Sequence, residues 1–180
     1  MTGSLAISAA PSTEVAAARV DSRSFRSGMA RLAAGVNIVT STGPGGWCGF
    51  TASAVCSVTD DPPTLLVCAN RGSQSYDTIR ASGILCVNAI AGQHEELSMR
   101  FAGANGIKDM AARFAGAEWT TMVTGAPALA DANVSFDCRV VRNVEIGTHD
   151  TFFCEVLAVR EARSLDGMVY FGRKFHRVIV

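Results

Sequence analysis

The chain has 180 residues and a formal net charge of zero, with 48% hydrophobic and 18% charged residues. A balanced charge, without a Lys/Arg cluster interleaved with aromatic residues, argues against binding to nucleic acid or to anionic membranes. Uninterrupted apolar runs all fall short of the ~20 residues that span a bilayer, so the apolar excess is expected in a core, a subunit interface and a ligand pocket.

The first segment of the chain, 1–21, is expected to be a disordered N-terminal tail. It is rich in small residues, but it lacks the basic start and the solid apolar stretch of a signal peptide. The remaining residues, 22–180, are expected to form a single domain, since a chain of this length fits one domain better than two.

The helices and strands are expected to follow one another irregularly along the domain. A helix over 21–35 can be capped by Asp21, Ser22 or Ser24 and closed by Gly35. The turn at 43–46 would join strands on either side into a hairpin. Further strands are expected at 64–70, 84–91, 132–147 and 149–163, a last strand near the C-terminus, and helices at 71–83, 92–102 and within 103–119.

This order of elements predicts a mainly β fold. Strands dominate, and regular crossover helices do not separate them, which argues against a doubly wound parallel sheet. The order instead favours a closed or nearly closed antiparallel barrel with short helices at its ends.

The stretch 49–55, GFTASAV, is unusual for a buried strand because small residues and hydroxyls replace Val, Ile and Leu. Glycine and alanine allow a ligand to approach the backbone closely. A tight strand crossing or a barrel corner without a ligand would explain the same composition, so the residues alone leave both interpretations open.

The six cysteines, at 48, 56, 68, 86, 138 and 154, show no C-x-x-C spacing, and the three histidines are far apart in sequence. Metal-ligand clustering is therefore not expected. Most of the cysteines lie in apolar, strand-like runs, which favours free, buried thiols in a reducing cytoplasm.

Several stretches of the chain together resemble the flavin reductase-like family, and most closely the short-chain NAD(P)H:flavin oxidoreductases of two-component flavin-dependent monooxygenases. They are FRSGMARLAAGVNIVTS, GFTASAVCSVTDDPP, CANRGSQS, ILCVNAIA, ELSMRFAG, IGTHDTFFCEV and YFGRKFHRV. The resemblance implies a Greek-key split β-barrel of the FMN-binding type with short flanking helices. It also implies a homodimer that binds FAD or FMN, with NADH as co-substrate and the reduced flavin passed to a partner monooxygenase.

The resemblance also implies residues for the flavin. The motif within 49–55 would contact the isoalloxazine, since its short side chains leave room for a flat ring. The start of the helix expected at 71–83 would suit a phosphate. Ordinary helix capping is the alternative for Ser73 and Ser75, and Phe101 could equally be a core residue. The flavin candidates are Thr51, Ala52, Ser53, Ala54, Ser57, Asn70, Ser73, Ser75, Arg100 and Phe101.

For NADH, the resemblance implies His149, Arg173 and Phe175. The family usually has Gly-Asp-His where this chain has Gly147, Thr148 and His149, and Phe175 replaces its C-terminal tyrosine. Hydride transfer between two cofactors needs alignment more than proton transfer, so no catalytic acid or base is assigned.

Two other functions compete with an NADH-dependent flavin reductase. One is a non-enzymatic flavin carrier or sensor built on the same barrel. The other is an oxidase of the pyridoxamine-phosphate type, which ranks last because the chain lacks a basic cluster suited to a substrate phosphate beside the flavin.

Overall fold

The computed structural model describes residues 19–163 and 165–180, so most of the predicted tail lies outside the described residues. The helices, with one 3-10 turn, are α1 (Ser22–Met29), α2 (Tyr76–Ser82), η1 (Gly92–His94), α3 (Glu95–Phe101) and α4 (Met110–Arg113). The strands are β1 (Ala34–Gly35), β2 (Asn37–Gly43), β3 (Gly46–Ala52), β4 (Val55–Asp60), β5 (Pro63–Asn70), β6 (Ile84–Ala89), β7 (Trp119–Thr121), β8 (Pro127–Leu129), β9 (Val134–Ile146), β10 (His149–Glu161), β11 (Asp166–Phe171) and β12 (Lys174–Ile179).

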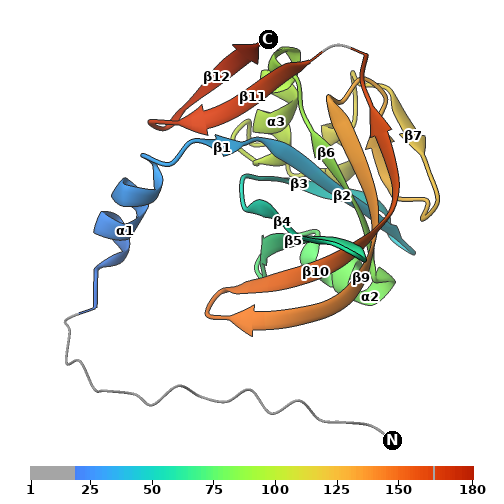
Figure 1. The fold of residues 1–180 in the computed structure, drawn as a ribbon, viewed down its shortest axis with the longest axis horizontal. Coiled ribbons are helices and arrows are strands. Elements are labelled where there is room, and N and C mark those ends of the chain that lie inside the picture. Colours follow the sequence, from blue (N-terminus) through green and yellow to red (C-terminus); the bar gives the residue numbers. More distant parts are fainter. Residues whose placement is uncertain (1–18, 164) are drawn as a thin grey trace, which may run out of the picture.

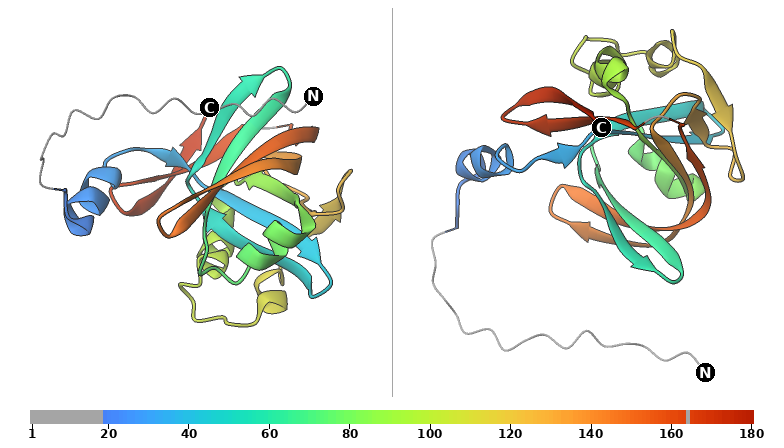
Figure 2. Two further views of the ribbon diagram at one scale, coloured as in Figure 1. Left: turned by 90° about the horizontal axis from the view of Figure 1, so that it is seen from below. Right: turned by 45° about the horizontal axis from the view of Figure 1, so that its top comes forward.

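Seven of the strands form one antiparallel sheet in the order β3-β2-β6-β9-β10-β5-β4. Its two edge strands, β3 and β4, are consecutive in the chain, and the sheet curls strongly between them (Figure 1). The short helices lie at the ends and flanks of this curled sheet, as Figure 2 shows from two further directions. The mainly β, split-barrel architecture that the sequence predicts is therefore confirmed.

The main hydrophobic core lies inside the curl of the sheet. Along β5, alternate side chains are buried, and Leu65, Val67 and Ala69 pack with Phe152 of the neighbouring strand β10. This period of two is what a strand with one buried face requires. A second cluster joins Phe101 of α3, Phe114 and Met168 at the end of the sheet where α3 and β11 lie.

The C-terminal segment is a hairpin, although the sequence analysis expected a single last strand. β11 and β12 pair across a tight turn at Gly172 and Arg173, whose φ angles are 60° and 65°. Positive φ at both central residues is the geometry of a type I′ hairpin turn. The hairpin pairs with β1 to form a separate three-stranded sheet, which projects beside α3 (Figure 1).

Two predicted elements are shorter than expected. The helix predicted over 21–35 ends at Met29, because the chain must become extended for Ala34 and Gly35 to pair with β11. Asp21 caps it as predicted, accepting hydrogen bonds from the backbone amides of Arg23 and Ser24 at 2.8 and 2.9 Å.

The strand expected after the 43–46 turn is interrupted at Ser53 and Ala54. There the chain crosses from one edge of the sheet to the other, and the Ala54 carbonyl accepts a hydrogen bond from the backbone amide of Cys68 on β5. Among the described residues, no helix combines the length and apolarity needed to cross a membrane.

Candidate flavin-binding site

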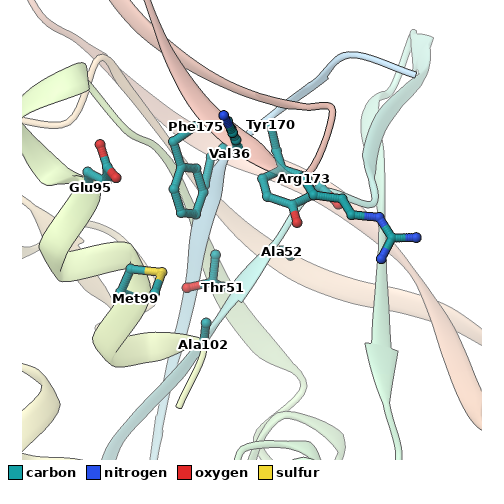
Figure 3. Close-up of a pocket in the computed structure, with 11 residues that line it drawn as sticks. Val36, Thr51, Ala52, Glu95, Met99, Ala102, Tyr170, Arg173 and Phe175 are labelled. Atoms are coloured by element: carbon teal, nitrogen blue, oxygen red, sulfur yellow. The ribbon is translucent and has the colours of Figure 1, made fainter. Parts of the chain in front are cut away.

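A groove begins where β3 ends, between α3 and the β11–β12 hairpin. Its first chamber has a volume of about 680 Å³, within the usual range for small-molecule sites. Thr51 and Ala52 lie at its base, helix residues on one side and hairpin residues on the other (Figure 3). The lining residues are Val36, Thr51, Ala52, Ser53, Glu95, Met99, Ala102, Tyr170, Arg173, Lys174 and Phe175.

The base of the first chamber is the end of the small-residue strand. β3 is an edge strand, so one side of its backbone faces the groove instead of another strand. The Thr51 hydroxyl donates a hydrogen bond of 2.5 Å to the carbonyl of Ser98, which fixes α3 against β3. Ser53 is exposed and has just left the ladder. The strand therefore offers backbone and short hydroxyls to a ligand, with no large side chain in the way.

The helical side of the chamber comes from one face of α3. Glu95, Met99 and Ala102 are spaced by four and three residues, so they lie on one face of the helix. Neither Glu95 nor Met99 is among the residues predicted from the sequence. The sequence separation of Glu95 and Met99 from Thr51 does not indicate that they line one chamber. The packing of α3 against β3 brings them together.

The hairpin side of the chamber is aromatic and basic. Tyr170 and Phe175 are a cross-strand pair with ring centroids 5.3 Å apart. Arg173 lies in the turn, and Lys174 is the first residue of β12. Two cations and one carboxylate, Glu95, line the chamber, so the chamber suits a planar ligand with a negative charge. Of the residues predicted for NADH, Arg173 and Phe175 line the first chamber.

The groove continues into a second chamber of about 460 Å³, which shares Thr51 and Ala102 with the first. Arg113 reaches it from α4, donating hydrogen bonds of 3.0 Å to the Ile107 carbonyl and to Gln74 Oε1. Asn70, Gly72 and Ser73 line it from the loop after β5. A fixed guanidinium and a hydroxyl are groups that bind phosphate. Arg113 was missed because no anion-binding pattern surrounds it in the sequence, and Gln74 was not named although it lies between the predicted residues Ser73 and Ser75.

Several predicted flavin residues point elsewhere. Ser75 is fully buried, and its hydroxyl donates a 2.9 Å hydrogen bond to the Gly49 carbonyl instead of capping α2. Arg100 donates to the Ala115 carbonyl and to Glu96, each at 2.6 Å. Ser57 is exposed on β4, outside both chambers. Their hydroxyls and guanidinium are thus not directed into the groove.

The remaining candidates are divided between the groove and its surroundings. Phe101 lines the second chamber but is 2% exposed and packs edge-on against Phe114, with centroids 4.9 Å apart. Ala54 lies in a smaller hollow of about 390 Å³ between α1 and the groove, which also includes Ser53, Tyr170 and Arg173.

The structure does not bring the three predicted NADH residues together. His149 is exposed at the β9–β10 turn, pairs with Asn70 in the ladder, and lines neither chamber. Its Nδ1 lies 2.9 Å from the Thr148 hydroxyl. The turns of the β9–β10 and β11–β12 hairpins lie at separate corners of the molecule (Figure 1). Among the described residues, no group of His, Cys, Asp and Glu is placed to hold a metal ion.

The fold and the groove together define a mainly β protein with a ligand-sized groove, whose base at Thr51 and Ala52 carries short side chains. A family model described as flavin reductase like domain matches residues 29–178. The chain belongs to this family, which confirms the resemblance seen in the sequence.

Relatives support the assignment in sequence and in structure. The FMN reductase (NADH) RutF of Stutzerimonas stutzeri is 55% identical over 152 residues, 84% of this chain and 86% of that protein. The NADH:FAD oxidoreductase SgcE6 of Streptomyces globisporus has a TM-score of 0.80 at 27% identity, covering 91% of this chain and 99% of its own. BorF, the flavin reductase component of a bacterial two-component tryptophan halogenase, has a TM-score of 0.81 at 27% identity, covering 89% and 99%.

Proposed function

We propose that this protein uses NADH to reduce FMN or FAD, and that the reduced flavin then leaves to serve a separate monooxygenase. The observation that carries the proposal is the two-chamber groove along β3, which has a flat, unobstructed base at one end and Arg113 at the other. These residues fit a flavin, because the flat base can accept its ring and Arg113 can bind its phosphate. The relatives named FMN reductase (NADH) support NADH and FMN for this chain.

The protein's part in the reaction is to hold and align. A bound flavin supplies the hydride-accepting ring, and the chain supplies the geometry around it. Thr51, Ala52 and Ser53 would support the ring at the base, while Arg113 and Ser73 would hold the phosphate. Arg173 and Phe175 stand at the open side of the first chamber, where they would hold the nicotinamide nucleotide.

Consumption of NADH, with and without added free flavin, tests this function. A reductase that releases its product should oxidise NADH rapidly only when FMN or FAD is supplied in excess. Tight binding of one flavin without turnover would instead support the carrier or sensor. Parallel assays with FMN and FAD, and with NADH and NADPH, would settle the preferences.

Release of a diffusible reduced flavin has its own test. The reductase and an oxygenase are placed on opposite sides of a flavin-permeable membrane at low oxygen. Hydroxylation should persist, because no stable complex is needed. Complete loss of coupled hydroxylation, with reduced flavin shown to cross intact, would contradict release and favour channelling between bound partners.

A homodimer in the cytoplasm belongs to the same proposal. None of the side chains of α1 is buried: Phe25 and Met29 are 61% and 47% exposed, and Leu32, just after the helix, is 60% exposed. An apolar helix face of this kind is suited to a second subunit. All six cysteines are free thiols, and burial raises the pKa of Cys154 to about 12. Unpaired thiols of this number are typical of a reducing compartment.

A further inference from the structure

A second large cavity lies outside the groove, on the other side of α4, and we call it the aromatic cleft. Its volume, about 680 Å³, equals that of the first chamber. On α4, Arg113 faces the groove, whereas Met110 and Ala111 face the cleft. The cleft is lined by Gly45, Gly46, Trp47, Asp109, Met110, Ala111, Phe114, Ala115, Ala117 and Trp119.

The walls of the cleft are three aromatic rings held in place by packing and one hydrogen bond. Phe114 stands between Trp47, with ring centroids 5.5 Å away, and Trp119, 4.9 Å away. The Trp119 indole donates a 3.0 Å hydrogen bond to the Phe114 carbonyl, which fixes its ring. Trp47 is 41% exposed, so part of its ring is open to a ligand. Exposed indole faces of this kind stack on flat heteroaromatic rings.

The approach to Trp47 is open, and the polar group beside it is an acceptor. Cβ atoms placed on Gly45 and Gly46 would meet nothing within 4 Å, so a flat ring has free access. The Asp109 carboxylate accepts a 3.2 Å hydrogen bond from the Ala111 amide and keeps capacity for further donors. A carboxylate repels phosphate and favours a ring that carries an amino group. Adenine has a flat surface for Trp47 and an exocyclic amine for Asp109.

We propose that the aromatic cleft binds the adenine ring of an adenine dinucleotide. The identity of the dinucleotide rests on the proposed function, because NADH and FAD are the adenine dinucleotides of that reaction. Arg113 and the cleft lie on opposite sides of α4, and a helix is about 10–12 Å across. A diphosphate near Arg113 can therefore place its adenosine over α4 and into the cleft.

The probe for the cleft itself is AMP, which contains neither flavin nor nicotinamide. Both tryptophans of the chain, Trp47 and Trp119, line the cleft, so tryptophan fluorescence reports its occupancy. We expect saturable quenching by AMP, and weaker binding of IMP, whose ring carries a carbonyl in place of the amine. Failure of AMP to bind the wild-type protein, by fluorescence and by calorimetry, would overturn the proposal.

Variants at Trp47 separate stacking from folding. Trp47→Ala should weaken AMP binding on the order of tenfold by calorimetry, whereas Trp47→Phe should retain most of it. Val123→Ala, an exposed apolar residue outside the cleft, is the matched control and should bind AMP as wild type does. Circular dichroism checks that each variant is folded. Equal AMP affinity in Trp47→Ala and wild type would place AMP elsewhere and reject the cleft.

The two sources of adenine are distinguished by paired ligands. If FAD occupies the cleft, Trp47→Ala should weaken FAD binding but not FMN binding. If NADH occupies it, Trp47→Ala should weaken binding of NAD⁺ but not of nicotinamide mononucleotide. No change in either pair would overturn the proposal. These are binding measurements, so they remain decisive even if the protein fails to reduce flavin, a result that would count against the proposed function alone.

Discussion

At the scale of single residues, burial and position in the fold together decide which side chains line the groove. Ser53, Ser57 and Ser75 all carry hydroxyls in or near the predicted motifs. Ser53 lines the first chamber, Ser57 is exposed on the far edge strand, and Ser75 is buried against Gly49. A motif gives residue types and spacing, but it does not say on which side of the strand crossing each hydroxyl lies.

Ser53→Ala should therefore weaken flavin binding, and Ser57→Ala should leave it unchanged. Loss of one hydrogen bond to the ring costs about 1 kcal/mol, or roughly fivefold in the dissociation constant. Titration of FMN and FAD into the three proteins measures it. Equal losses in the two variants would show that Ser57 also contacts the flavin and that the groove extends further than the chambers seen here.

Arg173 gives a second prediction at this scale. It is the one non-glycine residue with positive φ in the described chain, and its side chain lines the first chamber. Asparagine tolerates this backbone conformation, so Arg173→Asn removes the charge without adding backbone strain. We expect the KM for NADH to rise about tenfold, as for a lost charge-assisted hydrogen bond, with flavin affinity nearly unchanged.

The comparison for Arg173 is His149→Ala, assayed at saturating flavin. His149 lies outside both chambers, yet the sequence resemblance places it in the NADH site. An increase in KM for NADH with His149→Ala would support that role, and a fall in kcat as well would mean that the imidazole helps to position the nicotinamide. Unchanged kinetic constants would make His149 a residue of the turn.

At the scale of elements, buried polar contacts hold helices to the sheet and so position the groove. Tyr76 of α2 donates a 3.1 Å hydrogen bond to Asp150 Oδ2 on β10, which also accepts from Asn143 Nδ2 at 2.8 Å. Asp150 is fully buried, and its other oxygen, Oδ1, lacks a hydrogen-bond partner among the described residues. The carboxylate therefore depends on Tyr76 and Asn143.

Tyr76→Phe should destabilise the protein by about 1–3 kcal/mol, the usual effect of removing a partner from a buried polar group. The denaturant midpoint should fall while the slope stays the same. Asp150→Asn and the double variant complete a double-mutant cycle, which should report a coupling energy between the two residues. Strictly additive effects would mean that the hydroxyl contributes nothing through Asp150.

Element boundaries show how far sequence reasoning reached. Capping by Asp21 and the break between the strands predicted at 132–147 and 149–163 depend on neighbouring residues, and the structure has both. The break at Ser53, the early end of α1 and the C-terminal hairpin depend on pairing with distant strands, namely β5, β11 and β12. In the groove, Thr51 to Ser53 were named from the family resemblance, since their unusual composition alone left two interpretations open. Glu95, Met99 and Arg113 lie there because α3 and α4 pack against β3, which no local pattern encodes.

At the scale of the whole molecule, α1 is the least supported element. It extends from the body of the protein (Figure 1) and buries none of its side chains. Helices in folded proteins usually gain most of their stability from tertiary packing. The hollow beneath α1 includes Phe25 and Met29, and it shares Ser53, Tyr170 and Arg173 with the first chamber. Whatever covers α1 therefore also borders the groove.

We predict that a second copy of the chain covers α1, so that the protein is a dimer at micromolar concentration by light scattering. Phe25→Glu places a charge in the apolar face of α1, and it should shift the protein towards monomer because burial of an unpaired charge is costly. Flavin affinity should fall with it, since the border of the first chamber is then exposed. Val123→Glu, at an exposed apolar site away from α1, is the control and should remain dimeric. A monomeric wild-type protein, or a Phe25→Glu variant that stays fully dimeric, would show that α1 does not form the subunit interface.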